Sequence, residues 1–374
     1  MAIQLRALTW DDPRGRGPSR PLAEAFARTE AGAGVDVQWD VQPLGGFESA
    51  SVVEHARQYD VMVIDHPHVI EAAAAGLLAP IELDPDDCYV GPCLASYRWR
   101  GRQWAAPVDA ASHVAAYRGR GTLPPATWAK FFEQATHGMR FGLPLRGVHA
   151  LMALLTLLAS MGAPFDAQAA EREPGAGLPG ETDLLHALQL LFQISTVCVP
   201  ESRNWNPLEA LAALSDGFCD CLPLTFGYAH FQRRAVRFAR IPAIDAERPP
   251  RPILGGTGMA VSAQRPHVET ALALVRLAAS GEVQVNLWPQ HGGQPAHRKA
   301  WRRLAETDSF YRDAASSLEA AYVRPRCIGW NQFQTSAGEA LNRWLSDGAS
   351  SANDMAGQLR SSWYETTNIN IKML

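Results

Sequence analysis

The sequence predicts an α/β protein of two domains, and three observations support this prediction. The chain has 374 residues, about two to three times the commonest domain size. Hydrophobic residues make up 47% and charged residues 19% of it, which is enough apolar material for large cores. Short strand patterns alternate with helical patterns along most of its length, as in mostly parallel sheets flanked by helices. One small domain and global disorder are therefore excluded.

The N-terminal part begins this alternation. Residues 5–9 are apolar enough for a short buried strand, and a Gly/Pro/Arg loop separates them from a helix that begins near Pro21. Residues 35–41 (VDVQWDV) alternate as a strand does, and a helix is expected around 49–58. Residues 60–64 (DVMVI) form a second compact apolar strand. Together these segments predict the first β-α-β arrangement of the chain.

Polar side chains follow two of these strands. Trp10 and Asp11 come after the first strand, and Asp65 and His66 come after the strand at 60–64. In open α/β sheets, ligands bind beyond the carboxyl ends of the strands. The sequence therefore predicts that these four residues lie on the rim of a binding site.

The middle of the chain contains an uncharged apolar stretch, residues 147–165, that needs its own interpretation. It is almost long enough to cross a bilayer. It also carries His149 and Pro164 and lacks the usual aromatic and basic anchors. We interpret it as a buried core helix.

The remaining elements continue the alternation. A hairpin and an extended segment are expected over 100–117, where the chain crosses between domains. Further helices are expected over 127–136, 183–196, 207–215, 266–280 and 337–364, and further strands over 140–143, 219–224 and 255–262.

Charge and motifs exclude several function classes. Lys plus Arg total 34 and Asp plus Glu total 38, and no basic block tracks along the chain, so nucleic acid is not an expected partner. No G-x-S-x-G, H-E-x-x-H or phosphate loop occurs, and nothing orders the carboxylates and histidines into an acid-base pair. We expect no catalysis, no cofactor and no metal.

Taken in order, the segments resemble the family 1 extracellular solute-binding proteins, the substrate-capturing components of ABC importers, most often for sugars. Residues 60–82 are similar to the family's strand, site loop, helix and G-L-L-x-P/E ending, and residues 101–118 to its G-K-x-Y-G-x-P pattern and crossover strand. Residues 123–135 resemble its P-x-T-W-x-E segment, 218–231 its aromatic site loop and 253–280 its returning Gly-Gly strand and helix.

The resemblance implies a two-lobed periplasmic-binding-protein-like fold. Each lobe is expected to be a mostly parallel sheet flanked by helices, with the ligand cleft between the lobes and closure about a hinge. The expected lobes are residues 1–109 with 260–312 and residues 110–259 with 313–374, with hinge crossings near 109, 259 and 312.

The resemblance and the strand ends together give ten candidate ligand-binding residues. They combine aromatic plates with polar groups, as sugar sites do. These residues are Trp10, Asp11, Asp65, His66, Asp109, Arg146, Phe226, Tyr228, Gly256 and Trp330.

Each candidate has a structural alternative. Trp10 also suits a core, Asp65 a helix N-cap, Asp109 a turn and Arg146 a solvated surface. Gly256 also suits a bulge where the chain crosses between domains.

The cysteines are few for this length. Cys219 and Cys221 flank Asp220 on one strand, and buried inert thiols are expected there rather than a metal or redox pair. Cys88 and Cys93 could form a disulfide in an oxidising compartment.

The leading hypothesis is a monomeric protein that captures a small polar solute, most often a sugar in the resembled family, and presents it to ABC permease subunits. A periplasmic location follows from the resemblance. The N-terminus runs directly into a strand pattern without the apolar stretch of a secretory signal, so the signal was either removed or never present. The alternatives are a cytoplasmic α/β enzyme or ligand sensor of the same fold, or a binding protein for a carboxylate solute.

Overall fold

The computed structural model describes residues 3–49, 52–85, 88–119, 121, 123–173 and 175–369. The chain divides into two compact units. Unit 1 comprises Met1–Ala111 and Gly255–Asp308, and unit 2 comprises Ser112–Leu254 and Ser309–Leu374. The divisions fall after residues 111, 254 and 308, whereas the crossings were expected near 109, 259 and 312. Each unit is thus assembled from two separate stretches of the chain.

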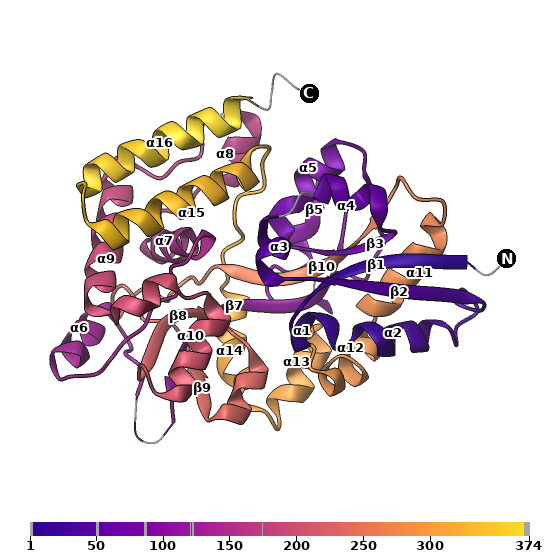
Figure 1. The fold of residues 1–374 in the computed structure, drawn as a ribbon, viewed down its shortest axis with the longest axis horizontal. Coiled ribbons are helices and arrows are strands. Elements are labelled where there is room, and N and C mark those ends of the chain that lie inside the picture. Colours follow the sequence, from indigo (N-terminus) through magenta and orange to yellow (C-terminus); the bar gives the residue numbers. More distant parts are fainter. Residues whose placement is uncertain are drawn as a thin grey trace. The chain divides into compact units, whose positions relative to one another are not determined.

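Unit 1 is built on a sheet whose strands lie in the order β2, β1, β3, β10 and β7 (Figure 1). β1 runs parallel to β2 and to β3, and β10 runs antiparallel to β3. β3 is buried along its whole length, as its continuous apolar run predicts. The strands of this unit are β1 (Ile3–Trp10), β2 (Val35–Gln42), β3 (Val61–Ile64), β4 (Leu78–Ala79), β5 (Arg98–Trp99), β6 (Arg102–Gln103), β7 (Ala106–Arg118) and β10 (Leu254–Ser262), of which β7 and β10 cross the unit boundary.

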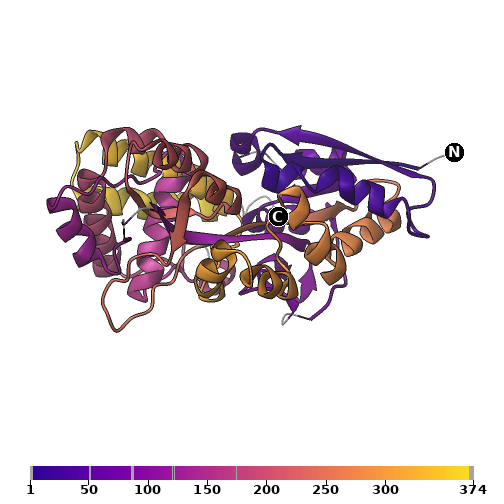
Figure 2. The ribbon, with the colours of Figure 1, turned by 90° about the horizontal axis from the view of Figure 1, so that it is seen from below.

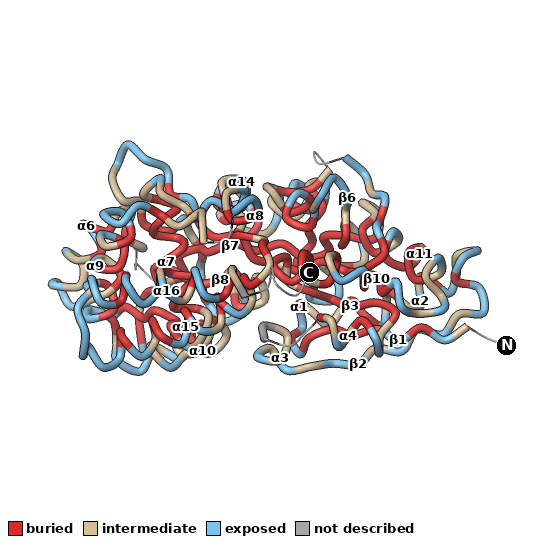
Figure 3. Tube along the Cα trace, turned by 90° about the horizontal axis from the view of Figure 1, so that it is seen from above, coloured by how far each residue is buried: buried red, intermediate tan, exposed pale blue. Residues whose placement is uncertain are grey.

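Helices flank this sheet and bury their apolar faces. The core on one side gathers Met62 and Ile64 of β3 with Val69 and Ala72 of α5, and it includes Tyr97. Figure 3 shows the buried course of β3 and β10. The helices of unit 1 are α1 (Pro13–Arg16), α2 (Ser19–Phe26), α3 (Leu44–Ser49), α4 (Val52–Gln58), α5 (Val69–Ala74), α11 (Val268–Ala279), α12 (Gly281–Asn286) and α13 (Arg298–Ala305), with short 3-10 turns at His66–His68, Ala95–Tyr97 and Pro289–His291.

The sheet of unit 2 differs from the mostly parallel sheet expected for each lobe. β8 (Cys221–Phe226) and β9 (Val236–Ala239) both run antiparallel to β7. The reason is that β7 enters unit 2 from unit 1, so its direction is not set by a parallel β-α-β connection within unit 2. Parallel pairing occurs in unit 2 at isolated bridges, including those of Phe141 with Cys198 and Cys221. These bridges replace the strand expected over 140–143, where Pro144 lacks the N–H needed to extend the ladder.

Helices form most of unit 2. α7 packs against α9 and α15, and α16 packs against α9 and α15; α15 and α16 are the yellow helices of Figures 1 and 2. The 3-10 turns of this unit lie at Pro200–Asn204 and Ala229–Arg234. Its helices are α6 (Trp128–Thr136), α7 (Val148–Met161), α8 (Ala167–Arg172), α9 (Glu181–Val197), α10 (Pro207–Asp216), α14 (Ser309–Glu319), α15 (Trp330–Asp347) and α16 (Ala352–Ile369).

The apolar stretch at 147–165 forms α7, whose residues from His149 to Ser160 are all buried. The interpretation as a core helix is confirmed, because this helix contributes Leu151, Leu154 and Leu158 to the core of unit 2. None of the helices in the described part of the chain combines the length and apolar character needed to span a bilayer.

Candidate ligand-binding site

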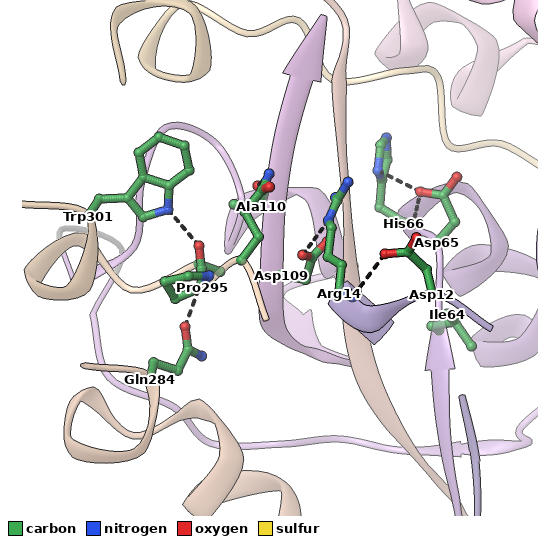
Figure 4. Close-up of polar contacts among 12 residues, drawn as sticks. Asp12, Arg14, Ile64, Asp65, His66, Asp109, Ala110, Gln284, Pro295 and Trp301 are labelled. Atoms are coloured by element: carbon green, nitrogen blue, oxygen red, sulfur yellow. Dashed lines mark hydrogen bonds and ion pairs between the residues drawn. The ribbon is translucent and has the colours of Figure 1, made fainter. Parts of the chain in front are cut away.

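The carboxyl ends of β1 and β3 in unit 1 carry four of the candidate residues. Because β1 and β3 are parallel, with Leu8 opposite Met62, their ends meet at one edge of the sheet. Asp65 follows β3, and its Oδ1 accepts a hydrogen bond from the backbone N–H of His66 at 2.8 Å. Nδ1 of His66 lies 3.2 Å from the same oxygen, so the two side chains are held together (Figure 4). Asp65 therefore acts as the N-cap of the turn at His66–His68, which is the structural alternative given for it from the sequence.

Trp10 lies at the end of β1 and is packed on both sides. Only 2% of it is exposed. Its ring stacks on Phe47 with centroids 5.7 Å apart, and the guanidinium of Arg14 lies 5.8 Å from the ring centroid. In the structure Trp10 holds α1 and α3 against the strand end; a ligand contact by it stays a prediction.

Asp109 is hydrogen-bonded by Arg14, a residue that was not among the candidates from the sequence. Nε and Nη2 of Arg14 donate to Oδ1 and Oδ2 of Asp109, each at 2.6 Å (Figure 4). Burial raises the pKa of Asp109, and the charge and hydrogen bonds of Arg14 oppose that rise. Asp12 caps α1 by accepting from the backbone N–H of Arg14 at 2.9 Å, which fixes the start of this helix.

The sequence contains one pattern that indicates the position of Arg14, a helix start. Asp12-Pro13 is a typical helix start, with an N-cap carboxylate before Pro at the first helical position. That pattern places Arg14 in a first helical turn at the rim of the sheet. It gives no information about a partner 95 residues further along the chain.

Asp11 and Arg146 lie on the surface. Asp11 pairs with Arg16 at 2.9 Å, and both side chains are more than half exposed. Arg146 pairs with Glu209 at 3.0 Å and donates to the carbonyl of Asn204 at 3.3 Å. The structure favours the surface alternative for Arg146, because Glu209 already occupies its guanidinium.

In unit 2, Phe226 lies at the end of β8 beside two histidines. The ring of His113 on β7 is 4.5 Å from the Phe226 ring, and the ring of His149 on α7 is 6.4 Å from it. Nδ1 of His113 lies 2.9 Å from Oγ1 of Thr156. Neither histidine was a candidate from the sequence, where His113 lies within the expected crossover segment and His149 within the expected core helix.

The His113 ring is held neutral. Burial, together with the nearby His149 and Arg324, lowers the pKa of His113 to about 3. A neutral imidazole donates through one nitrogen and accepts through the other. The group beside Phe226 therefore offers an aromatic face together with neutral donors and acceptors.

Tyr228 follows Phe226 and is nearly buried. Its ring meets the ring of His230 edge-on at 5.9 Å. Phe226 is partly exposed. Of the two aromatic candidates in this loop, Phe226 therefore has the more accessible ring.

Trp330 opens α15 and is fully buried, with 0% exposed. Phe165, Phe333 and Trp363 surround its ring at centroid distances of 5.6 to 6.2 Å. Its Nε1 donates to Oε1 of Gln334 at 3.2 Å. The structure therefore favours a packing role for Trp330 over the expected ligand contact, because rings of its own unit cover it.

Gly256 has a φ of 103°, and a Cβ there would approach the carbonyl oxygen of Asp109 to 2.3 Å. Close backbone packing is thus sufficient to require glycine at this position. A contact between its amide and a ligand stays a prediction.

The six cysteines all lie in the described part of the chain, and none is in a disulfide. The structure therefore contains no Cys88–Cys93 bridge. Cys219 and Cys221 are both buried, as expected, and burial raises the pKa of Cys219 to about 12 and that of Cys221 well above its usual value.

No family model and no curated protein matches this sequence. Solved structures match it along almost its whole length. A receptor of Streptomyces glaucescens, GacH, solved unliganded and with acarbose, is 18% identical with a TM-score of 0.81 and covers 98% of this chain and 99% of its own.

Two further structures agree. A solute-binding protein of an ABC transporter from Thermotoga lettingae, bound with α-D-tagatose, is 14% identical with a TM-score of 0.81 and covers 98% of this chain and 100% of its own. One from Agrobacterium radiobacter, in complex with ribitol, is 20% identical with a TM-score of 0.79 and covers 97% and 98%. The chain has the two-lobed α/β fold of these proteins, and the predicted fold class is confirmed.

Proposed function

We propose that this chain captures a sugar or sugar-like solute for an ABC importer. The observation that carries the proposal is the agreement in fold over 97–98% of the chain with proteins solved with acarbose, tagatose and ribitol. These ligands differ in size and ring form but share a dense set of hydroxyl groups. A polyhydroxylated solute is therefore the best-supported ligand class.

The chemistry of the candidate residues is consistent with such a solute. Unit 1 carries the carboxylate of Asp65 and the imidazole of His66 after β3, and the aromatic pair Trp10–Phe47 at the end of β1. Unit 2 supplies Phe226 beside His149. A sugar needs an apolar plate for its C–H face and hydrogen-bonding groups for its hydroxyls, and each unit contains candidate residues of both types.

In this proposal the solute is bound by hinge closure at the chain crossings and is released without chemical change. A monomer outside the cytoplasmic membrane presents it to the permease subunits of the importer. No residue acts as an acid, base or nucleophile. Binding free energy comes from stacking and hydrogen bonds alone.

A thermal-shift screen tests the proposal. Carried-over ligand is first removed from the purified protein, which is then screened against sugars, polyols, organic acids and amino acids. A ligand at about 100 times its Kd stabilises the protein by roughly 2.7 kcal/mol. We expect hits confined to sugars or polyols, with the ligand recovered unchanged by mass spectrometry.

Three outcomes would count against the proposal. Hits confined to organic acids would indicate a carboxylate-binding protein. A converted ligand would indicate an enzyme of the same fold. Silence across every panel, in protein shown to be folded, would remove the support for solute capture.

A further inference from the structure

Asp84, Cys88 and His297 of unit 1 place three different metal-ligand side chains together. One ligand atom from each lies within 4.8 Å of those from the other two. Four ligands around one zinc ion at 2.0–2.3 Å are about 3.3–3.8 Å apart, so a small contraction brings these three into range. The cluster has no residue in common with the candidate ligand-binding site.

The fold holds the two sides of this cluster in register. Tyr89 and His297 form an antiparallel bridge, and the backbone N–H of Val90 donates to the carbonyl of Ala296 at 3.0 Å. Arg298 Nη2 donates to the carbonyl of Tyr89 at 2.7 Å. Cys88 immediately precedes this bridge, so its position relative to His297 is fixed by backbone pairing.

A backbone hydrogen bond keeps Cys88 near Asp84. The backbone N–H of Cys88 donates to the carbonyl of Pro85, the residue after Asp84, at 3.0 Å. Asp84 is exposed and Cys88 is half-buried, while His297 is buried. Asp84 also lines a cavity of about 390 Å³ with Glu82, Tyr89 and Arg276, so this cavity reaches one of the three side chains.

We propose that Asp84, Cys88 and His297 bind one zinc ion, with water completing a tetrahedral site. A thiolate and an imidazole select zinc over magnesium and calcium, which prefer oxygen ligands alone. Three protein ligands and one open position are a common zinc arrangement. The ion joins Asp84 and Cys88 to His297 at the start of α13 and stabilises unit 1.

The hydrogen bonding of His297 gives a specific consequence. Its Nδ1 accepts from the backbone N–H of Lys299 at 3.2 Å and so caps α13. Zinc on Nδ1 takes the lone pair that makes this bond. Zinc on Nε2 makes Nδ1 the protonated nitrogen of a neutral ring, which no longer accepts. In either case the amide of Lys299 loses its acceptor when the ion binds.

Titration of the full chain with zinc tests the proposal. Protein treated with a chelator, and free of any tag, is titrated by calorimetry; we expect one equivalent to bind. The substitutions Asp84→Asn, Cys88→Ser and His297→Gln should each weaken zinc at least about tenfold. Cys93→Ser and His291→Gln, a cysteine and a histidine outside the cluster, should leave it unchanged.

Cobalt and NMR give independent readouts. Cobalt bound to the wild type should show sulfur-to-metal charge-transfer absorption that Cys88→Ser abolishes, and zinc should shift the amide resonance of Lys299. If His297→Gln fails to fold, Asp84→Asn and Cys88→Ser still test the proposal. Asp84 is exposed and Cys88 is half-buried, so we expect these two variants to fold. Less than half an equivalent of zinc, equal losses in the control variants or no thiolate absorption would overturn the proposal.

Discussion

Arg14 and Asp109 form a buried bidentate ion pair between α1 and β7. The two hydrogen bonds are both 2.6 Å long, and the side chains are 5% and 3% exposed. Two charges in such a place are stable only as a pair, because neither can be hydrated alone. Since α1 directly follows the Trp10 end of β1, the pair fixes the edge of the sheet that carries the unit 1 candidates.

Breaking this pair should destabilise the protein strongly. We expect Arg14→Met to lower the free energy of unfolding by about 3–5 kcal/mol, because it leaves the Asp109 carboxylate buried without a counter-charge. The double variant Arg14→Met/Asp109→Leu should recover most of that loss, since no charge is then buried. Urea denaturation of the wild type and these variants measures both effects.

The exposed pair Arg16–Asp11 provides the control. Its side chains are 57% and 61% exposed, so Arg16→Met should change the free energy of unfolding by only about 0–1 kcal/mol. Equal losses for Arg14→Met and Arg16→Met would show that the buried pair has no special role. A double variant as unstable as the Arg14 single variant would show that packing, not charge, accounts for the loss.

The neutral, buried His113 should make the protein acid-sensitive. Burial lowers its pKa to about 3 in the folded state, whereas the unfolded chain has the ordinary value near 6.5. Between these values the unfolded state binds one more proton, so stability is complete above about pH 6.5 and falls by about 1.4 kcal/mol per pH unit toward pH 3. Urea denaturation at intervals from pH 7.5 to 4 measures this slope.

The variant His113→Asn isolates the contribution of this one side chain. It removes the titrating group but keeps a polar atom for Thr156, so its pH dependence should be shallower by about 1.4 kcal/mol per pH unit. His137→Gln, at an exposed histidine, should keep the wild-type slope. Parallel curves for His113→Asn and the wild type would refute the assignment.

The fold was predicted well for those elements whose own sequence pattern determines them. The strands predicted at 5–9, 35–41 and 60–64 are present as β1, β2 and β3, because short apolar or alternating runs are typical of β-strands. α7 formed because an uncharged run of its length must be buried. α13, with four basic residues among its eight, was not predicted, since its stability comes from packing of Ala300 and Trp301.

Long-range pairing limited what could be predicted of the site. Asp65 and His66 became candidates because strand ends in parallel sheets are a general location for ligands, and their contact with a ligand stays a prediction. The partner of Asp109 and the grouping of His113, His149 and Phe226 depend on contacts between distant segments, which no local pattern encodes. The packing of Trp330 among Phe165, Phe333 and Trp363 depends on distant segments in the same way, so its sequence position alone did not distinguish a ligand plate from a core residue.

Replacing Gly256 should lower the free energy of unfolding whether or not its amide contacts a ligand. Its φ of 103° disfavours any side chain, and a Cβ would overlap the backbone of Asp109 and Ala110. We expect Gly256→Ala to lower the free energy of unfolding by about 2–4 kcal/mol. Gly45→Ala, where a Cβ has open space and φ is not positive, should be neutral or slightly stabilising. Thermal unfolding of both variants checks this, and a stable Gly256→Ala protein would contradict the backbone geometry.

Phe226 is the aromatic residue of unit 2 best placed to contact a solute, because it ends β8 partly exposed beside His113 and His149. We expect Phe226→Ala to weaken the solute found by the thermal-shift screen at least about tenfold, or 1.4 kcal/mol, through loss of a stacking face. Phe218→Ala removes a 66% exposed ring of the same unit and should leave the Kd unchanged. Calorimetric titration of both variants, with unfolding curves to confirm that each is folded, decides between them. An unchanged Kd for folded Phe226→Ala would remove this residue from the site while leaving solute capture itself intact.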